Sequence, residues 1–175
     1  MTAYSRPDDW LQVDPALDFT RPELGTLVAL WCERCRDGRL PARADFDLVD
    51  LKGHLGWIVL SDVDRAGPTP LRFRYRLIGT QVAISAGRDM TGRYLDEIYT
   101  PEIHRIVTAG YRAAIELRRP IRVHGYFRQV DRSFMAIESV ELPLASDGET
   151  IDMLMIRDCI SFAGDQRPRL DQAAE

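Results

Sequence analysis

The sequence predicts an α+β fold: a five-stranded antiparallel sheet with helices on one face and an extra N-terminal helix. The first observation is residues 71–78, where apolar and arginine side chains alternate as in a strand with one buried face. The second is residues 101–117, where apolar side chains recur at helical spacing. The third is the order of elements, because two strands precede this helix and three follow it. We expect strands at 56–63, 71–78, 121–128, 134–144 and 151–162.

The segment after the second strand is an irregular crossover. Gly79 ends the strand, a short helix is expected over 80–86, and Gly87 ends that helix. Gly92 gives a second sharp turn before the long helix, whose start is marked by Thr100 as cap and Pro101 at the first position. The arginine face of residues 71–78 is expected to be wet or to meet carboxylates, since buried guanidinium groups repel one another.

An N-terminal helix is expected over residues 20–37. Thr20 and Glu23 have the spacing of a capping box, and Gly38 ends the pattern. Its apolar stripe packs either on the chain's own sheet or on a second subunit, so a homodimer is a candidate assembly. The interface residues expected in the second case are Leu24, Leu27, Val28 and Trp31.

The chain of 175 residues suits one core with attached segments. Residues 1–19 are an N-terminal arm, 20–55 hold the N-terminal helix and a connecting segment, and 56–163 form the core. Residues 164–175 are polar and are expected to be a flexible C-terminal tail.

Composition excludes several classes of protein. A net charge of −4 gives no general attraction for nucleic acid or anionic lipid. No apolar run approaches the roughly 20 residues of a membrane helix, and the N-terminus lacks a secretory signal pattern. We therefore expect a cytoplasmic protein with no nucleic-acid or membrane partner.

The three cysteines argue against a disulfide framework, since their number is odd. Cys32 and Cys35 form a C-x-x-C pair, but it lies within the helical pattern with no second pair. We interpret both thiols as structural, with a redox role as the open alternative.

Three segments carry a resemblance to a known family. They are Trp31 with LPARADFD at 40–47, FRYRLIGT at 73–80 and GRDMTG at 87–92. In this order and spacing they resemble the PAS_5 family of short alphaproteobacterial PAS-fold proteins, over roughly residues 24–162. The resemblance implies a PAS-like fold for the core and a role as a bacterial sensor or interaction module in signal transduction. It implies no reaction.

No metal, haem or flavin site is expected. His54, His104 and His124 fall in three different elements without paired spacing, so they do not form a metal-ligand set. His104 is the candidate for a haem ligand by comparison with haem-binding PAS proteins, but its predicted direction is outward. The loop at 87–92 lacks the cysteine of flavin-binding PAS domains. No catalytic motif is present, and Glu138 and Glu141 are predicted to lie on opposite faces of one strand.

A ligand pocket is expected between the long helix and the sheet. The alternative is that the same side chains simply fill the core. Arg88 is the polar group best placed to anchor an acid, so the expected ligand is small and either apolar or acidic. The predicted lining is Tyr75, Ile84, Arg88, Met90, Tyr94, Val107, Tyr111, Phe127, Ile137 and Met155.

These observations predict a non-enzymatic PAS-like sensory or adaptor protein that acts through protein–protein contacts, with a ligand as a modulator. The alternative is a small-molecule binding protein with an internal pocket. The sequence predicts no enzyme, since no acid, base or metal group converges with another.

Overall fold

The structure is a computed structural model that describes residues 11–65, 71–128 and 134–162. The side chains of residues 127, 128, 134, 135 and 162 lie outside this description, as does the predicted tail at 164–175. In chain order the elements are β1 (Leu11–Asp14), α1 (Pro22–Arg34), η2 (Arg43–Asp45), η3 (Leu55–Trp57), β2 (Ile58–Asp64), β3 (Arg72–Ile78), α2 (Thr80–Ala86), α3 (Leu95–Ile98), α4 (Pro101–Leu117), β4 (Ile121–Arg128), β5 (Phe134–Leu144) and β6 (Met153–Phe162).

The sheet is antiparallel throughout and has the strand order β1-β4-β5-β6-β2-β3. The five predicted strands are present, and a sixth, β1, comes from the segment predicted as an arm. It pairs with β4, so that Val13 lies opposite Val123 and Asp14 lies opposite Arg122. Because Leu11 and Val13 alternate with polar residues, this short segment has one apolar face to place on the core.

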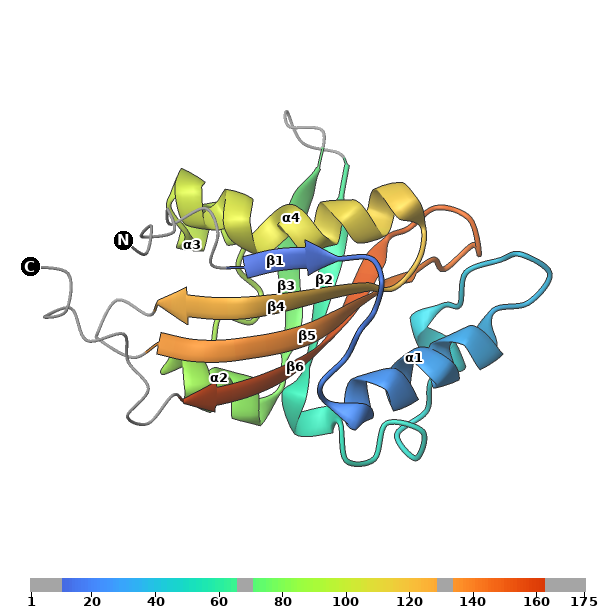
Figure 1. Cartoon of the computed structure of the whole chain (residues 1–175). Coiled ribbons are helices and arrows are strands. Elements are labelled where there is room, and N and C mark those ends of the chain that lie inside the picture. The colour runs from blue at the N-terminus through green and yellow to red at the C-terminus, as the bar shows by residue number, and fades with distance from the viewer. Residues whose placement is uncertain (1–10, 66–70, 129–133, 163–175) are drawn as a thin grey trace, which may run out of the picture.

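Helices cover both faces of the sheet, α4 on one and α1 on the other (Figure 1). On the first face, the rings of Phe73 and Tyr111 meet edge to face with centroids 5.3 Å apart. On the second face, Trp31 Nε1 donates a hydrogen bond of 2.9 Å to the carbonyl oxygen of Pro143. The extra helix therefore makes the domain a three-layer structure with the sheet in the middle.

The α1 side of the sheet carries a row of apolar side chains on β5. The side chains of Val140, Leu142 and Leu144 are fully buried, and they alternate with Glu141, which faces α4. Leu24 and Leu27 of α1 are also fully buried against this face. Burial of such side chains contributes about 1.5–3 kcal/mol each and fixes the position of α1.

The two long helices begin differently from each other. Thr100 caps α4 by accepting a hydrogen bond of 3.4 Å from Ile103 N, as its sequence predicts. The capping box predicted for α1 is wrong: the cap position is Arg21, and the helix runs only to Arg34. Thr20 binds Glu138 instead, because a buried carboxylate is available to accept from both its N–H and its hydroxyl.

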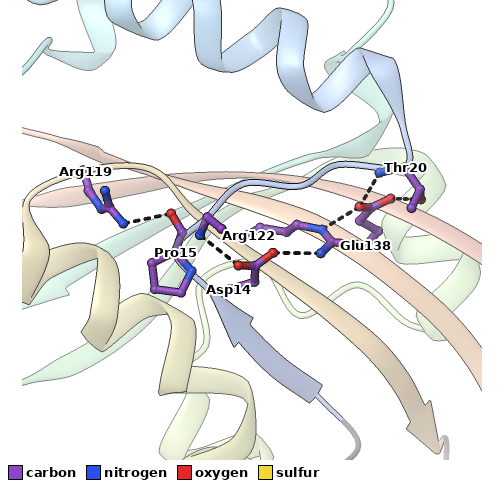
Figure 2. A network of polar contacts seen from close by, with 7 residues as sticks. Asp14, Pro15, Thr20, Arg119, Arg122 and Glu138 are labelled. Atoms are coloured by element: carbon purple, nitrogen blue, oxygen red, sulfur yellow. Dashed lines mark hydrogen bonds and ion pairs between the residues drawn. The ribbon is translucent and has the colours of Figure 1, made fainter.

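A buried polar network ties β1, β4, β5 and the start of α1 together (Figure 2). Arg122 donates to Glu138 at 2.7 Å and to Asp14 at 2.8 Å. Glu138 also accepts from Thr20 N at 2.9 Å and from Thr20 Oγ1 at 2.5 Å. Since Thr20 and Glu138 are 118 residues apart, this network closes the N-terminal segment onto the core.

The arginine face of β3 meets carboxylates, as its sequence predicts. Arg74 donates to Asp62 on β2 at 2.7 Å, and Arg76 lies 3.5 Å from the same carboxylate. Arg72 forms a bidentate ion pair with Asp96 of α3, with both hydrogen bonds at 2.8 Å. These partly exposed ion pairs connect β3, the edge strand of the sheet, to β2 and to α3.

Candidate ligand site between helix α4 and the sheet

A cluster of phenols and carboxyls lies between α4 and the sheet. We call it the interior cluster; its members are Tyr75 of β3, Tyr99 just before α4, Tyr111 of α4, Glu141 of β5 and Asp158 of β6. Glu141 lies against α4, because a Cβ atom on Gly110 would overlap its carboxyl oxygens. Asp158 faces the same side, since it pairs with Ser139, two residues before Glu141.

The three tyrosines are linked to one another. The hydroxyls of Tyr75 and Tyr99 are 3.3 Å apart, and that of Tyr99 lies 4.0 Å from Met90 Sδ. Burial raises the pKa of Tyr75 and of Tyr111 well above the usual value, and the pKa of Tyr99 is raised for the same reason. All three phenols are therefore neutral hydrogen-bonding groups at physiological pH.

Glu141 is the most unusual member of the interior cluster. Its side chain is buried, with 3% of the residue exposed, and its Oε2 atom has no hydrogen-bond partner among the described residues. Burial, reinforced by the charge of Asp158, raises the pKa of Glu141 well above its usual value. Burial therefore favours the protonated form of Glu141.

Asp158 is the second acid of the cluster. Burial raises its pKa to about 7, against an opposing effect of Arg157. It interacts electrostatically with Glu141 and with the tyrosines Tyr75, Tyr99 and Tyr111. A group of this pKa changes its protonation state within the physiological range.

A family model described as PAS domain, PAS_5, matches residues 20–156 of the chain. The chain belongs to the PAS_5 family of PAS domains. The match runs from the start of α1 into β6 and so includes the interior cluster except Asp158. No curated protein matches the chain.

Part of the predicted pocket lining meets at the interior cluster of this PAS domain. Tyr75, Met90 and Tyr111 are buried and lie there with Tyr99. Val107 on α4 and Ile137 on β5 are half-buried, and Ile137 shares the strand face of Glu141.

Other predicted lining residues lie elsewhere in the PAS domain. Ile84 is 71% exposed on α2, and Arg88 is exposed in the loop after it. Met155 is fully buried on the α1 side of the sheet, where it pairs with Leu142. Tyr94 stacks under Arg72 at 3.7 Å on the outer edge of β3. The side chain of Phe127 lies outside the described residues.

The predicted interface residues are mostly inside the PAS domain itself. Leu24, Leu27 and Trp31 are buried on the chain's own sheet, and Val28 is half-buried. Their burial supports the intramolecular alternative for the α1 stripe. The cysteines are free: Cys32 is exposed, Cys35 is half-buried and Cys159 is buried.

A concave surface feature lies on the face of β2 and β3 that carries Asp62 and Arg74. We call it the outer cleft; it has a volume of ≈ 730 Å³ and is open to solvent. Three acidic and three basic side chains line it together with Tyr94 and Ser146: Arg43, Asp62, Asp64, Arg74, Arg76 and Asp152.

The sequence interpretation missed Tyr99, Glu141 and Asp158. Asp158 had a usable signal, because it falls on the same strand face as Ile156 and Ile160, which marks an acid pointing into the core. Glu141 had a signal of the same kind, because strand alternation places it on the opposite face of β5 from Glu138. Within the described ranges, no group of three or more His, Cys, Asp or Glu side chains could hold a metal ion. No helix in this part of the chain is long and apolar enough to cross a membrane.

Proposed function

We propose that this PAS domain is a non-enzymatic sensory or adaptor module that acts through protein–protein contacts and is modulated by a small molecule bound at the interior cluster. The observation that carries this proposal is the unpartnered Oε2 of Glu141. A buried polar atom without a partner costs about 1–3 kcal/mol, and a ligand that hydrogen-bonds to it offsets that cost.

The outer cleft is the surface we propose for the protein partner. Its guanidinium and carboxylate groups can form charged pairs with a complementary protein surface, which favours specificity and fast association. Arg76 has 60% of its side chain exposed and shares Asp62 with Arg74, so it remains available to a partner. Because α1 is packed on its own sheet, a homodimer would also have to use a surface of this kind.

The test of the adaptor role combines light scattering with partner capture. We expect size-exclusion chromatography with light scattering, or affinity capture from bacterial extract followed by reconstitution from purified components, to yield a defined dimer or heteromer. Arg76→Glu should weaken that complex, whereas Lys52→Glu, an exposed change outside the outer cleft, should leave it intact. A strict monomer that captures no reconstitutable partner would contradict the proposal.

A second candidate function is a small-molecule binding protein without a protein partner. The clustering of Tyr75, Tyr99 and Tyr111 with two acids favours it, since binding sites combine apolar walls with a few polar groups. Native mass spectrometry of the purified chain should then show a bound mass. A clean apo mass, with no thermal shift across a metabolite panel, opposes both ligand roles.

We propose no reaction for the interior cluster. Its phenols and protonated carboxyls lack a nucleophile–base pair among the described residues. The three free thiols are consistent with a reducing compartment, which supports a cytoplasmic location for the protein.

A further inference from the structure

All five members of the interior cluster are acids. Each is neutral when protonated and negative when ionised, so none can neutralise a negative charge on a ligand. Arg157, the neighbour of Asp158 in sequence, points away from the cluster: it directs its guanidinium to His54 Nδ1 and Cys159 Sγ, both at 3.4 Å on the α1 side. Electrostatically the interior cluster is therefore suited to a cation.

The charged groups around the cluster do not reverse this preference. Arg88 lowers the pKa of Tyr99 but is itself exposed, so solvent screens it. His104 of α4 interacts with Asp96 and Arg112, and burial lowers its pKa, so it is neutral. A carboxylate ligand would thus meet neutral or negative groups inside. The cations beside the cluster, Arg88 and Arg112, are both exposed, and the Arg112 guanidinium lies 5.6 Å from the centroid of the Phe73 ring.

Glu141 provides an acceptor that is fixed in place. Its carboxyl lies against the backbone of α4 at Gly110, where a side chain would overlap it. Oε2 is buried and finds no partner among the described residues, so a donor brought by a ligand would be its partner. Asp158 lies on the same sheet face on the neighbouring strand, diagonal to Glu141, and so places a second acceptor on that face.

At one end of this layer, side chains on the covered face are only half-buried. Ile137, Asp158 and Ile160 lie on the sheet face that α4 covers, yet they are only half-buried. Val107 on the facing helix is half-buried as well. A small ligand that reaches Asp158 would enter at this end of the layer.

We infer that the interior cluster binds a small protonated primary amine, with the ammonium group donating hydrogen bonds to Glu141 and Asp158 and an apolar or aromatic body against the tyrosines. The inference rests on the proposed ligand modulation and gives the chemical class of that ligand. It replaces the apolar or acidic ligand expected from Arg88. An aromatic body suits these surroundings, because the neighbouring side chains Phe73, Tyr75 and Tyr111 are themselves aromatic.

Binding of an ammonium ion is linked to proton release. In the free protein, burial favours the protonated form of Glu141, and Asp158, with a pKa of about 7, is protonated below that pH. The arriving cation stabilises the carboxylate, so R–NH₃⁺ binds and one carboxyl proton leaves to solvent. Affinity should therefore rise about tenfold per pH unit between about pH 5 and pH 7 if one proton is released.

The test is calorimetric titration of the full chain with 2-phenylethylamine, beside ammonium and methylammonium as smaller probes. The matched controls are 2-phenylethanol, which has no charge, and 3-phenylpropanoate, which has the opposite charge. Titration in two buffers of different ionisation enthalpy reports the proton release directly. We expect at least tenfold tighter binding of an amine than of either control near pH 8.

The variants Glu141→Gln and Asp158→Asn keep the shape of each side chain and remove its charge. Each should weaken amine binding at least tenfold and reduce the proton release, whereas Asp96→Asn on the surface should change neither. Unchanged far-ultraviolet circular dichroism will show that the variants fold. Weaker amine binding with an unchanged number of protons released per bound amine would indicate a merely structural role and overturn the inference.

The outcomes separate this inference from the proposed function. Equal binding of amine and alcohol, or tighter binding of the carboxylate, overturns the amine class but leaves ligand modulation standing. Failure of all probes, including the small ammonium ions, overturns the amine class as well. If that failure comes with a clean apo mass, the ligand-modulated part of the proposed function also fails, while partner capture still tests the adaptor part.

Discussion

Glu138 and Glu141 lie three residues apart on β5 and have opposite electrostatic environments. Burial alone would raise the pKa of Glu138, but hydrogen bonds from Thr20 and Arg122 outweigh it and lower the pKa. Glu141 has no such donors, so burial raises its pKa. The strand alternation predicted from the sequence places them on opposite faces, and their different hydrogen-bond partners set the direction of each pKa shift.

The ion pair at Glu138 is expected to contribute much more to the free energy of unfolding than the ion pairs on the surface. The Glu138→Ala variant leaves Arg122 with its charge buried and only Asp14 as a partner. We expect a loss of about 3–5 kcal/mol of unfolding free energy. Asp96→Ala, which breaks the exposed pair with Arg72, should lose less than about 1 kcal/mol. Urea unfolding of both variants checks this, and equal losses would mean that the network in Figure 2 is weak.

Asp158 should make the folded protein less stable as pH rises. Its folded pKa of about 7 lies above the ordinary value of 3.8, so the folded state binds the proton more tightly than the unfolded state does. Its contribution is therefore fully present below about pH 4 and is lost as pH rises through about 7. Asp158→Asn should then gain about 1–3 kcal/mol over the natural chain at pH 8 and little at pH 4. A gain that is constant over this pH range would contradict the raised pKa.

At the scale of elements, the closest approach of α4 to the sheet is at Gly110. A Cβ atom there would overlap both Glu141 and Val123 Cγ2, so the missing side chain lets the helix sit on β4 and β5. Gly25 in α1 is the matched contrast, because a Cβ atom there would only touch Phe19 at 4.0 Å. The two glycines therefore have different physical reasons for being tolerated in a helix.

Alanine substitutions should separate these two cases. Gly25→Ala is expected to stabilise the protein by about 0.5–1 kcal/mol, since alanine is the better helix former. Gly110→Ala gains the same propensity but forces α4 from the sheet, so we expect a net loss of about 1–3 kcal/mol. Thermal and urea unfolding measure both. If Gly110→Ala were stabilising, Glu141 would have to move easily, and its fixed position would be refuted.

Local signals predicted the elements whose stabilising contacts are local. The start of α4 depends on Thr100 and Pro101, which are its neighbours in sequence, and it lies where the sequence places it. The start of α1 depends on Glu138, far along the chain, so Thr20 was assigned to a capping box that does not form. The strand β1 also depends on a distant partner, because it pairs with β4, more than 100 residues away in sequence.

The candidate site was predicted only in part, because the sequence indicates the element to which a residue belongs more clearly than the direction in which its side chain points. Ile84 and Met155 belong to elements near the interior cluster, but one points to solvent and the other to the α1 side. The strand period could have excluded Met155, which alternates with Ile156. The direction of Ile84 depends on how α2 packs beside η3, a tertiary contact that no local pattern contains.

At the scale of the whole molecule, one sheet serves two separate interfaces (Figure 1). Odd-numbered residues of β5 such as Glu141 contribute to the α4 side, and even-numbered residues such as Glu138 contribute to the α1 side. Within the described part of the chain, no hydrogen bond joins side chains of the two interfaces, but both interfaces depend on the same backbone pairing of β4, β5 and β6. We therefore expect a single cooperative unfolding transition in which the two sides contribute independently.

A double-mutant cycle measures that independence. It combines Gly110→Ala on the α4 side with the milder Glu138→Gln on the α1 side, so that the double variant remains folded. The losses of unfolding free energy should add to within about 0.5 kcal/mol, because the two changes have no partner in common. A coupling above about 1 kcal/mol would contradict this. It would mean that β5 transmits strain across the sheet, and that a ligand under α4 could alter the packing of α1 and β1 by the same route.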